Sequence, residues 1–327
     1  MITDNVLKEF SGKTAIVTGG TGLIGRQVVN ILVDAGAIVK IISLDQNKVN
    51  KKAEHIIGDL ADFAFCKQIT QYTDFVFHIA GIKGSIKVTK EKPASFFVPL
   101  LMMNTNIIEA SRINKVHKFV YTSSIGAYSS TEIFVEGKNE DRPPMDEFPG
   151  LAKRVAEQQI LAYKIQYGLD NYSVVRLSNC FGPGDNFDPE NAMVIPTLMQ
   201  RIFNKEDPVV IWGDGSAIRD FAYSRDIAEG TILAMHHGTH SKYVNLGSGV
   251  GYSIKELVDT LHSFIKFNHV FDSTKPSGFL RRIMNIDLAR STIGYNPTTT
   301  LQQGLKETWE WFIKNPTDYL KKRNYFK

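Results

Sequence analysis

Three glycines spaced for phosphate binding are the clearest chemical signal in the sequence. Residues 18–25 read TGGTGLIG, between a short apolar run at 14–18 and a segment of helical spacing at 25–35. Gly19 permits a tight turn, Gly22 lets the backbone approach a pyrophosphate, and Gly25 allows close packing of helix and strand. The helix N-terminus then directs free N–H groups at the anion. The predicted dinucleotide-binding residues are therefore Gly19, Gly22, Leu23, Ile24 and Gly25.

A carboxylate follows the second predicted strand. Residues 38–44 form a β-type apolar run, and Asp45 comes directly after it. A carboxylate at this place accepts hydrogen bonds from the adenosine ribose and repels a 2′-phosphate. Asp45 therefore favours NAD over NADP. Two residues oppose this prediction, since Ser43 lies nearer the usual position of the acidic residue and Lys48 is close by.

Composition describes an ordinary globular protein. The 327 residues are 43% hydrophobic and 22% charged, enough for a large core, and the net charge of +4 is spread along the chain. This distribution gives no reason to expect nucleic acid and fits an anionic small molecule. Cys66 and Cys180 have no metal-ligand spacing, so we expect no bound metal. Two cysteines are too few for a disulfide framework, so we expect a reducing cytoplasm. We expect neither a signal peptide nor a membrane span, because no apolar run is long enough.

The order of elements predicts an α/β fold. Strand-like runs at 14–18, 38–44, 75–79, 118–122 and 172–177 alternate with helical patterns at 25–35, 94–114 and 150–168. This alternation indicates a Rossmann-type, doubly wound parallel sheet with helices on both faces. From Phe181 onward, Gly/Pro/Asp-rich connections separate shorter elements. We expect a dinucleotide-binding domain over 1–180 and a smaller α/β substrate-binding lobe over 181–327, with the chain crossing between them.

Several separated motifs make the chain resemble the extended short-chain dehydrogenase/reductase family, in its nucleotide-sugar branch. The resemblance covers nearly the whole length. It rests on the glycine run, GDL at 58–60, HIAG at 78–81, TSS at 122–124 with Tyr128, Lys153, and residues 176–184. WGDG at 212–215, RDF at 219–221, Asp226 and NLGSG at 245–249 resemble the family's substrate lobe.

The resemblance implies positions for the cofactor and the reacting sugar. Asp59 and Leu60 would flank the adenine, and Ala80 and Gly81 the cofactor ribose. Lys153 would bind the nicotinamide ribose hydroxyls, and Ser124 would hydrogen-bond the reacting sugar hydroxyl. From the residues alone, a turn residue is the other interpretation of Asp59, and a strand-end cap that of Ser124.

The second lobe supplies groups for a sugar diphosphate. Asn179 and the guanidinium groups of Arg219 and Arg282 suit its oxygens, although each arginine also fits a surface salt bridge. Lys83 follows the strand that ends near Ala80 and is placed for contact with the sugar, or is a solvated loop lysine. The loop at 182–196, with Val194 as a further substrate-binding residue, is similar to that of GDP-fucose synthases and favours a GDP-sugar.

One position departs from the family pattern. The family's catalytic tyrosine precedes the lysine by four residues, where this chain has Pro149, and no tyrosine here lies four residues before a lysine. Losing a positioned general base costs roughly 10²- to 10⁴-fold in rate. Lys153 could accept the proton directly or through water. Other candidate acid/base groups are Tyr128, Tyr223, Lys83, Glu140 and Asp141.

Differences from the family's motifs argue against two of the reactions that the family catalyses. The family's GDP-sugar 3,5-epimerases need a cysteine and a histidine where this chain has Gly126 and Met193, and its 4,6-dehydratases need acidic residues where Ile125 and Gly126 stand. The leading hypothesis is NAD-dependent oxidation of the C4 hydroxyl of a GDP-hexose or GDP-heptose to a 4-keto sugar, in bacterial-type polysaccharide precursor synthesis. The alternatives are a nucleotide-sugar 4-epimerase, a 4-keto reductase, or a non-catalytic NAD- and nucleotide-sugar-binding sensor or scaffold.

The resemblance also implies an assembly. In the family, the helices near 94–114 and 150–168 pair across a two-fold axis into a four-helix bundle. We expect a homodimer, with a homotetramer as the alternative. The apolar stripe of the first helix, part of which must be core, comprises Phe96, Phe97, Leu100, Leu101, Met103, Ile107 and Ile108.

Overall fold

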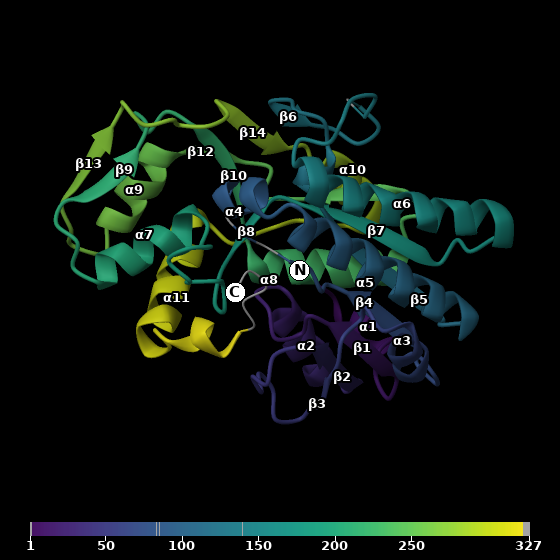
Figure 1. Cartoon of the computed structure of the whole chain (residues 1–327). Coiled ribbons are helices and arrows are strands. Elements are labelled where there is room, and N and C mark those ends of the chain that lie inside the picture. Colours follow the sequence, from purple (N-terminus) through teal and green to yellow (C-terminus); the bar gives the residue numbers. More distant parts are fainter. Residues whose placement is uncertain (1, 83, 85, 139, 323–327) are drawn as a thin grey trace.

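A seven-stranded parallel sheet organises the first lobe of the protein (Figure 1). The computed structural model describes residues 2–82, 84, 86–138 and 140–322. The strand order is β11-β7-β5-β4-β1-β2-β3. The strands are β1 Thr14–Thr18, β2 Ile38–Ser43, β3 Glu54–Ile57, β4 Phe75–His78, β5 Lys118–Ser124, β7 Tyr172–Leu177 and β11 Tyr243–Leu246. This order and the parallel pairing confirm the predicted Rossmann-type α/β fold.

Helices cover both faces of this sheet. The helices of the first lobe are α1 Asp4–Lys8, α2 Gly25–Asp34, α3 Phe63–Ile69, α4 Ile86–Glu91, α5 Ala94–Ile113, α6 Glu147–Tyr167, α8 Ser224–His237 and α10 Asp287–Ile293. Side chains alternate along β1, so that Val17 joins the core beneath α2 and α8, whereas Ile16 joins the core beneath α3, α5 and α6. Among the described residues, no helix is both long and apolar enough to cross a bilayer.

The second lobe contains a mixed sheet and a separate strand pair. The mixed sheet has the order β12-β10-β14-β6, with β8 paired to β10, and β9 pairs with β13. Its elements are β6 Ile133–Phe134, β8 Asn179–Phe181, α7 Val194–Phe203, β9 Val209–Trp212, β10 Ile218–Tyr223, β12 Gly251–Ser253, α9 Ile254–His262, β13 His269–Asp272, β14 Arg281–Met284, α11 Leu301–Lys314 and the 3₁₀ turn η2 Asp318–Lys321. Its core includes Phe187 stacked on Phe312, with ring centroids 4.1 Å apart.

The observed elements follow the predicted ones, with shifts of a few residues at their ends. The strand predicted at 118–122 continues to Ser124, and the helix predicted from Gly150 begins at Glu147, so that Pro149 lies in its first turn. A proline is tolerated there because the first helical N–H groups have no partner within the helix. Two strands of the main sheet, β3 and β11, carry no strong sequence signal. β11 returns to the first lobe from beyond Phe181, so the chain crosses between the lobes more than once.

The strand order reverses between β1 and β4, and this places a crevice at their carboxyl ends. β1 ends at Thr18 before the glycine loop, β4 ends at His78, and β5 ends at Ser124. Residues far apart in the sequence therefore meet at one edge of the sheet.

A buried ion pair fixes α6 against this sheet. Arg176 on β7 has a side chain only 1% exposed, and its Nη2 lies 2.5 Å from Glu157 Oε2 on α6. Its Nε donates a second hydrogen bond to Glu157 Oε1 at 2.9 Å, and Ser123 of β5 donates to the same oxygen. Since Lys153 lies one helical turn before Glu157, the pair also sets the position of that lysine.

We predict that Arg176→Met lowers the free energy of unfolding by about 3–5 kcal/mol, because it leaves the Glu157 carboxylate buried without its cation. Urea denaturation measures this change. Arg290→Met, which breaks an ion pair whose side chains are 50% and 73% exposed, is the control and should cost less than about 1 kcal/mol. A loss of similar size in both variants would contradict the anchoring role.

Candidate functional site

The glycine loop has the geometry that a pyrophosphate site requires. Gly19 adopts φ +66°, and a β-carbon there would lie 2.8 Å from Ala80 Cα. A β-carbon on Gly25 would collide with Gly19 O, so α2 packs directly on the turn. A β-carbon on Gly22 would meet only Gly19 O within 4 Å, which leaves its other side open. This cradle fits the phosphates of a nicotinamide dinucleotide, with Leu23 and Ile24 completing the turn into α2.

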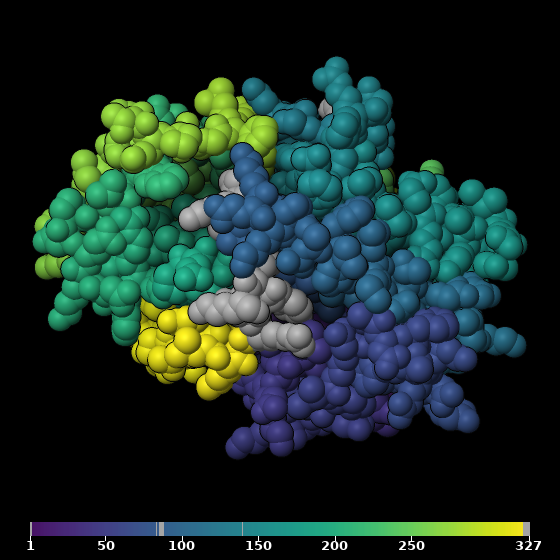
Figure 2. Space-filling model, viewed as in Figure 1, coloured from purple at the N-terminus to yellow at the C-terminus, as the bar shows by residue number. Residues whose placement is uncertain are grey.

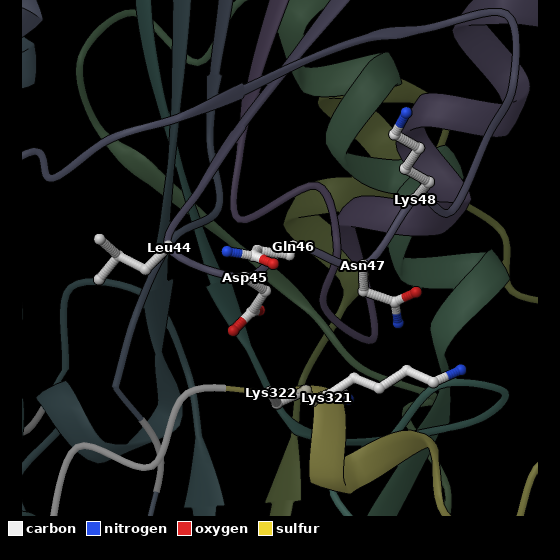
Figure 3. Close-up of a pocket in the computed structure, with 7 residues that line it drawn as sticks. All are labelled: Leu44, Asp45, Gln46, Asn47, Lys48, Lys321 and Lys322. Atoms are coloured by element: carbon white, nitrogen blue, oxygen red, sulfur yellow. The ribbon is translucent and has the colours of Figure 1, made fainter.

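Asp45 lines a cavity at the carboxyl end of β2 (Figure 3). Thr21 in the glycine loop donates a 2.9 Å hydrogen bond from Oγ1 to Asp45 Oδ2, so the predicted ribose-binding carboxylate is tied to the phosphate loop. The cavity measures about 680 Å³, and its lining residues are Leu44, Asp45, Gln46, Asn47, Lys48, Lys321 and Lys322. Burial lowers the pKa of Lys322 to about 8, the neighbouring Arg26 lowers it further, and Asp185, Asp318 and Asp45 oppose the change.

The C-terminal turn η2 closes one side of this region. Asp318 accepts a 3.0 Å hydrogen bond from Asn47 Nδ2 and lies 3.4 Å from Arg26 Nη2, and Lys322 Nζ donates to Gly184 O at 2.6 Å. Figure 2 shows the C-terminal residues, in yellow, seated against both the second lobe, in green, and the N-terminal residues, in purple. The sequence carries no motif that predicts this contact.

Ser124 is the last residue of β5, and Lys153 of α6 bonds to the same strand near its carboxyl end. Ser124 Oγ accepts a 3.1 Å hydrogen bond from Gly126 N–H, so it caps the short 3₁₀ turn η1 (Ile125–Ala127). Lys153 Nζ donates to Thr122 O at 2.9 Å and lies 5.4 Å from the centroid of the Tyr121 ring. Burial lowers the pKa of Lys153 to about 8, and the Glu157 carboxylate opposes that change. Ser124 therefore ends the strand whose Thr122 carbonyl accepts from Lys153, and the lysine is more acidic than an exposed one.

A buried hydrogen-bond chain supports this edge of the sheet. Thr18 Oγ1 accepts from the N–H groups of Ile79 and Ala80, both at 3.1 Å, and lies 2.8 Å from His78 Nδ1. Nδ1 must therefore accept the threonine proton. His78 Nε2 then donates to Asn104 Oδ1 at 2.8 Å, in agreement with burial lowering the pKa of His78 to about 4. A neutral histidine thus fixes the loop that carries Ala80.

The positions predicted around the adenine and ribose lie at the ends of β3 and β4. Asp59 is exposed and accepts a 2.9 Å hydrogen bond from Ala61 N–H, as a turn residue does. Leu60 is buried in the core beneath α3 and α5, and Gly81 is exposed after β4. Lys83 lies outside the described residues.

The second lobe places two guanidinium groups side by side. Arg219 on β10 pairs in register with Arg282 on β14. Arg219 Nη1 donates to Phe279 O at 2.6 Å, and Arg282 stacks on the Phe279 ring at 3.6 Å. Buried Arg282 Nε finds no acceptor among the described residues. Burial lowers the pKa of Arg282 to about 10; Asp146 opposes this change and Arg219 adds to it.

The other substrate-lobe positions are less directly placed. Asn179 is half-buried on β8 and donates from Nδ2 to Asp220 O at 3.2 Å. Val194 is the first residue of α7 and is also half-buried. No group of three His, Cys, Asp or Glu side chains within the described ranges could hold a metal ion.

Most of the other acid/base candidates are engaged elsewhere. The buried Tyr128 hydroxyl donates to Asn245 Oδ1 at 2.8 Å, and the Tyr223 hydroxyl donates to Glu307 at 2.5 Å. Glu140 accepts hydrogen bonds from Arg176 and from Tyr243. Asp141 is exposed. A different carboxylate, Asp146, lies beside Gly126 near Ser124, and no motif in the sequence indicates it.

Comparison with known proteins shows the family of the chain. Residues 15–247 match the model of the NAD dependent epimerase/dehydratase family. The chain is 30% identical over 315 residues to a probable GDP-L-fucose synthase 1 of Oryza sativa subsp. japonica, with 93% of each chain covered. It superimposes on the UDP-glucose 4-epimerase of Thermotoga maritima solved with UDP-glucose with a TM-score of 0.80, at 27% identity over 93% of this chain and 99% of that one. A GDP-L-fucose synthetase of Naegleria fowleri bound to NADP gives a TM-score of 0.79 at 25% identity over 93% of both chains. The chain therefore belongs to the NAD-dependent epimerase/dehydratase family.

The lowered pKa of Lys153 predicts how stability depends on pH. Below pH 8 the folded and unfolded chains both carry the charged lysine, and folding bears the full cost of burying it. Between pH 8 and 10.5 the folded chain has released this proton while the unfolded chain retains it, so the cost falls. We expect Lys153→Met to be about 2 kcal/mol more stable than the wild type at pH 7, with a smaller difference at pH 10.

Urea denaturation at both pH values measures this difference. Lys67→Met, which replaces an exposed lysine on α3, is the control and should show no such dependence. The prediction fails if the wild type and Lys153→Met keep a constant difference in stability across the range.

Proposed function

We propose that this protein is an NAD-dependent dehydrogenase that oxidises the C4 hydroxyl of a nucleotide-diphosphate sugar to a ketone. The observation that carries the proposal is that Ser124 ends β5 while the half-buried Lys153, with its lowered pKa, bonds to Thr122 of the same strand, at the edge of the sheet that bears the glycine loop. Arg219 and Arg282 offer paired cations for the diphosphate. Similarity to GDP-fucose synthases supports a GDP-linked hexose or heptose as the substrate.

Each residue has a defined part in the proposed reaction. A bound nicotinamide supplies the hydride acceptor. Ser124 Oγ accepts its hydrogen bond from Gly126, so its own proton is available to orient the sugar hydroxyl. The Lys153 ammonium binds the nicotinamide ribose and stabilises negative charge that develops on the sugar oxygen. Asn179, with the loop that leads to Val194, contributes to the nucleotide-sugar site.

Oxidation is favoured over a complete epimerase cycle because Pro149 stands at the position of the family's tyrosine. Without that phenol, rapid return of a proton to the 4-keto sugar lacks its usual donor. Gly126 and Met193 likewise provide no side-chain acid or base of their own. A 4-epimerase is the second candidate, and the similarity to the Thermotoga maritima UDP-glucose 4-epimerase supports it. A 4-keto reductase would run the same step in reverse, and a non-catalytic sensor or scaffold would bind the same ligands without turnover.

NAD is the proposed cofactor. Asp45 lies at the end of β2, where a carboxylate accepts from the adenosine ribose and repels a 2′-phosphate. Lys48, Lys321 and Lys322 line the same cavity and would attract an anion, so direct comparison of NAD with NADP is part of the test. We place the reaction in the cytoplasm, as a step toward polysaccharide precursors, since the two cysteines are free thiols.

Turnover of sugar nucleotides tests the function. We expect incubation with NAD and GDP-mannose or a GDP-heptose to produce NADH at 340 nm and a keto product by mass spectrometry. NADP should serve less well. Ser124→Ala should lower kcat by roughly 10²-fold, because it removes the group that orients the hydroxyl. Inversion at C4 without net NADH would identify an epimerase instead. Binding without any bond change, across GDP-, UDP-, CDP- and dTDP-sugars, would identify the sensor.

We also propose a homodimer formed through α5 and α6, which lie side by side at one edge of the molecule (Figure 1). Much of the predicted stripe, including Phe96 and Leu100, is buried core and does not reach the surface. The outward apolar residues include Val98 and Met102 on α5 and Leu151 and Val155 on α6, which are 40–49% exposed. A homotetramer is the alternative assembly.

Leu151→Glu combined with Val155→Glu should convert the dimer to a monomer, because it would bury charge in the helical interface. Size-exclusion chromatography with light scattering measures the mass. Leu280→Glu, at a 67% exposed position on the second lobe, is the control and should leave the dimer intact. A wild-type mass of 36.7 kDa would overturn this assembly.

A further inference from the structure

Asp146 lies at the start of α6, but its side chain does not cap the helix. It is the N-cap residue of α6, yet its side chain makes no capping hydrogen bond. An aspartate at an N-cap normally accepts from the N–H groups of the first turn, and this is worth about 1 kcal/mol. The carboxylate is directed instead toward Gly126, where a β-carbon would collide with Asp146 Oδ2. Asp146 therefore fills the space that a side chain at position 126 would take.

Backbone hydrogen bonds join Asp146 to the proposed reaction centre. Gly126 donates from its N–H to Ser124 Oγ at 3.1 Å and accepts at its carbonyl from Asp146 N–H at 3.2 Å. The same short turn thus positions the serine hydroxyl and the carboxylate. Gly150 packs so closely on this turn that a β-carbon there would collide with Gly126 O, which fixes the first turn of α6.

Helical spacing places Asp146 on the face of α6 that carries the lysine. Positions 146, 149 or 150, and 153 follow one another at three- and four-residue intervals along one helix face. Asp146 is therefore one turn before Pro149 and two turns before Lys153, with its carboxylate beside Gly126, two residues after Ser124. It remains solvent-accessible, as a group that meets a substrate must be.

The charged group that faces Asp146 across the lobes is Arg282 on β14. Loss of hydration within the surrounding protein raises the pKa of Asp146, and the Arg282 guanidinium opposes that rise. Lys153 and Arg154 on the same helix and Arg219 beside Arg282 are further cations of this region, and Arg154 donates to the Ala127 carbonyl of η1. The carboxylate thus lies beside the turn that follows Ser124 and within electrostatic reach of Arg282, the arginine proposed for the diphosphate.

We propose that Asp146 is the general base that stands in for the absent phenol. This inference rests on the proposed function. The sugar C4–H bond breaks as hydride passes to the oxidised nicotinamide, which is reduced. The C4 hydroxyl proton passes to Asp146, directly or through one water, and the C4–O bond becomes a carbonyl. Charge and atoms balance, since one alcohol, one NAD cation and one carboxylate give one ketone, one NADH and one carboxylic acid.

Asp146→Asn tests the assignment with GDP-mannose and NAD. We expect kcat to fall by roughly 10²-fold with KM changed by less than about threefold, because the amide keeps the shape but accepts no proton. The wild-type profile should lose activity as pH falls through the raised pKa of Asp146, and the variant should lack this acid limb. Glu147→Gln, which removes the neighbouring exposed carboxylate from the same helix turn, is the matched control and should behave as the wild type.

A gain of function provides a second test. Pro149→Tyr in the Asp146→Asn background restores a phenol four residues before Lys153 and should recover at least about tenfold of the lost kcat. The proposal is overturned if Asp146→Asn keeps the wild-type kcat and the wild-type loss of activity at low pH, or if it raises only KM. Either result would indicate that Asp146 serves to hold Arg282.

A measurement independent of turnover separates this proposal from the proposed function. The wild type and Asp146→Asn are labelled with ¹³C at the aspartate carboxyls and compared by NMR. The resonance that is present in the wild type and missing from the variant belongs to Asp146. It should titrate above the ordinary aspartate range and shift when GDP-mannose is added. If no nucleotide sugar is turned over, the proposed function fails, and this resonance alone decides whether Asp146 faces the sugar. A resonance that GDP-mannose leaves unmoved overturns the inference.

Discussion

The ion pair between Arg176 and Glu157 is the interaction on which the candidate site depends. The Arg176 guanidinium lies between the rings of Tyr128 and Tyr243, with centroids 4.2 and 3.6 Å away, and holds the Glu157 carboxylate of α6. Desolvating both charges is costly, so the pair is stable only because each charge is paired and hydrogen-bonded. The ion pair fixes the rotation of α6 about its axis, and this holds Lys153 at the end of β5.

The proposed site includes the cationic groups of Lys153, Arg219 and Arg282. Burial lowers the pKa values of Lys153 and Arg282, and Arg282 lies in register with a second guanidinium. Such crowding disfavours the empty protein, and an anion placed between the cations relieves it. A dinucleotide over the glycine loop and a sugar diphosphate near Arg219 would each supply that negative charge. The same electrostatics would therefore favour both proposed ligands.

The start of α6 holds Pro149, where the resemblance to the family places a tyrosine, without disturbing the helix. Proline fits the first helical turn because its missing N–H would have no partner within the helix there. It brings no hydroxyl, so proton transfer has to come from elsewhere. With no side chain on Gly126, the space beside Ser124 is open to the carboxylate of Asp146. The proposed role of Asp146 follows from this local arrangement, in which its carboxylate occupies the space beside Gly126. The hydrogen bond from Asp146 N–H to Gly126 O holds the backbone of the turn.

The sequence by itself determined the features that depend on near neighbours. The glycine loop and the alternation of strands and helices rest on residue spacing and on the backbone freedom of Gly19, which are local properties. Tertiary structure alone decided which distant segments meet. β11 joins the main sheet from 66 residues beyond β7, the turn η2 reaches Arg26 across 292 positions, and Asp146 reaches Gly126 through packing of α6 on η1. No periodicity predicts these contacts, because each is set by the summed packing and charge of the whole chain.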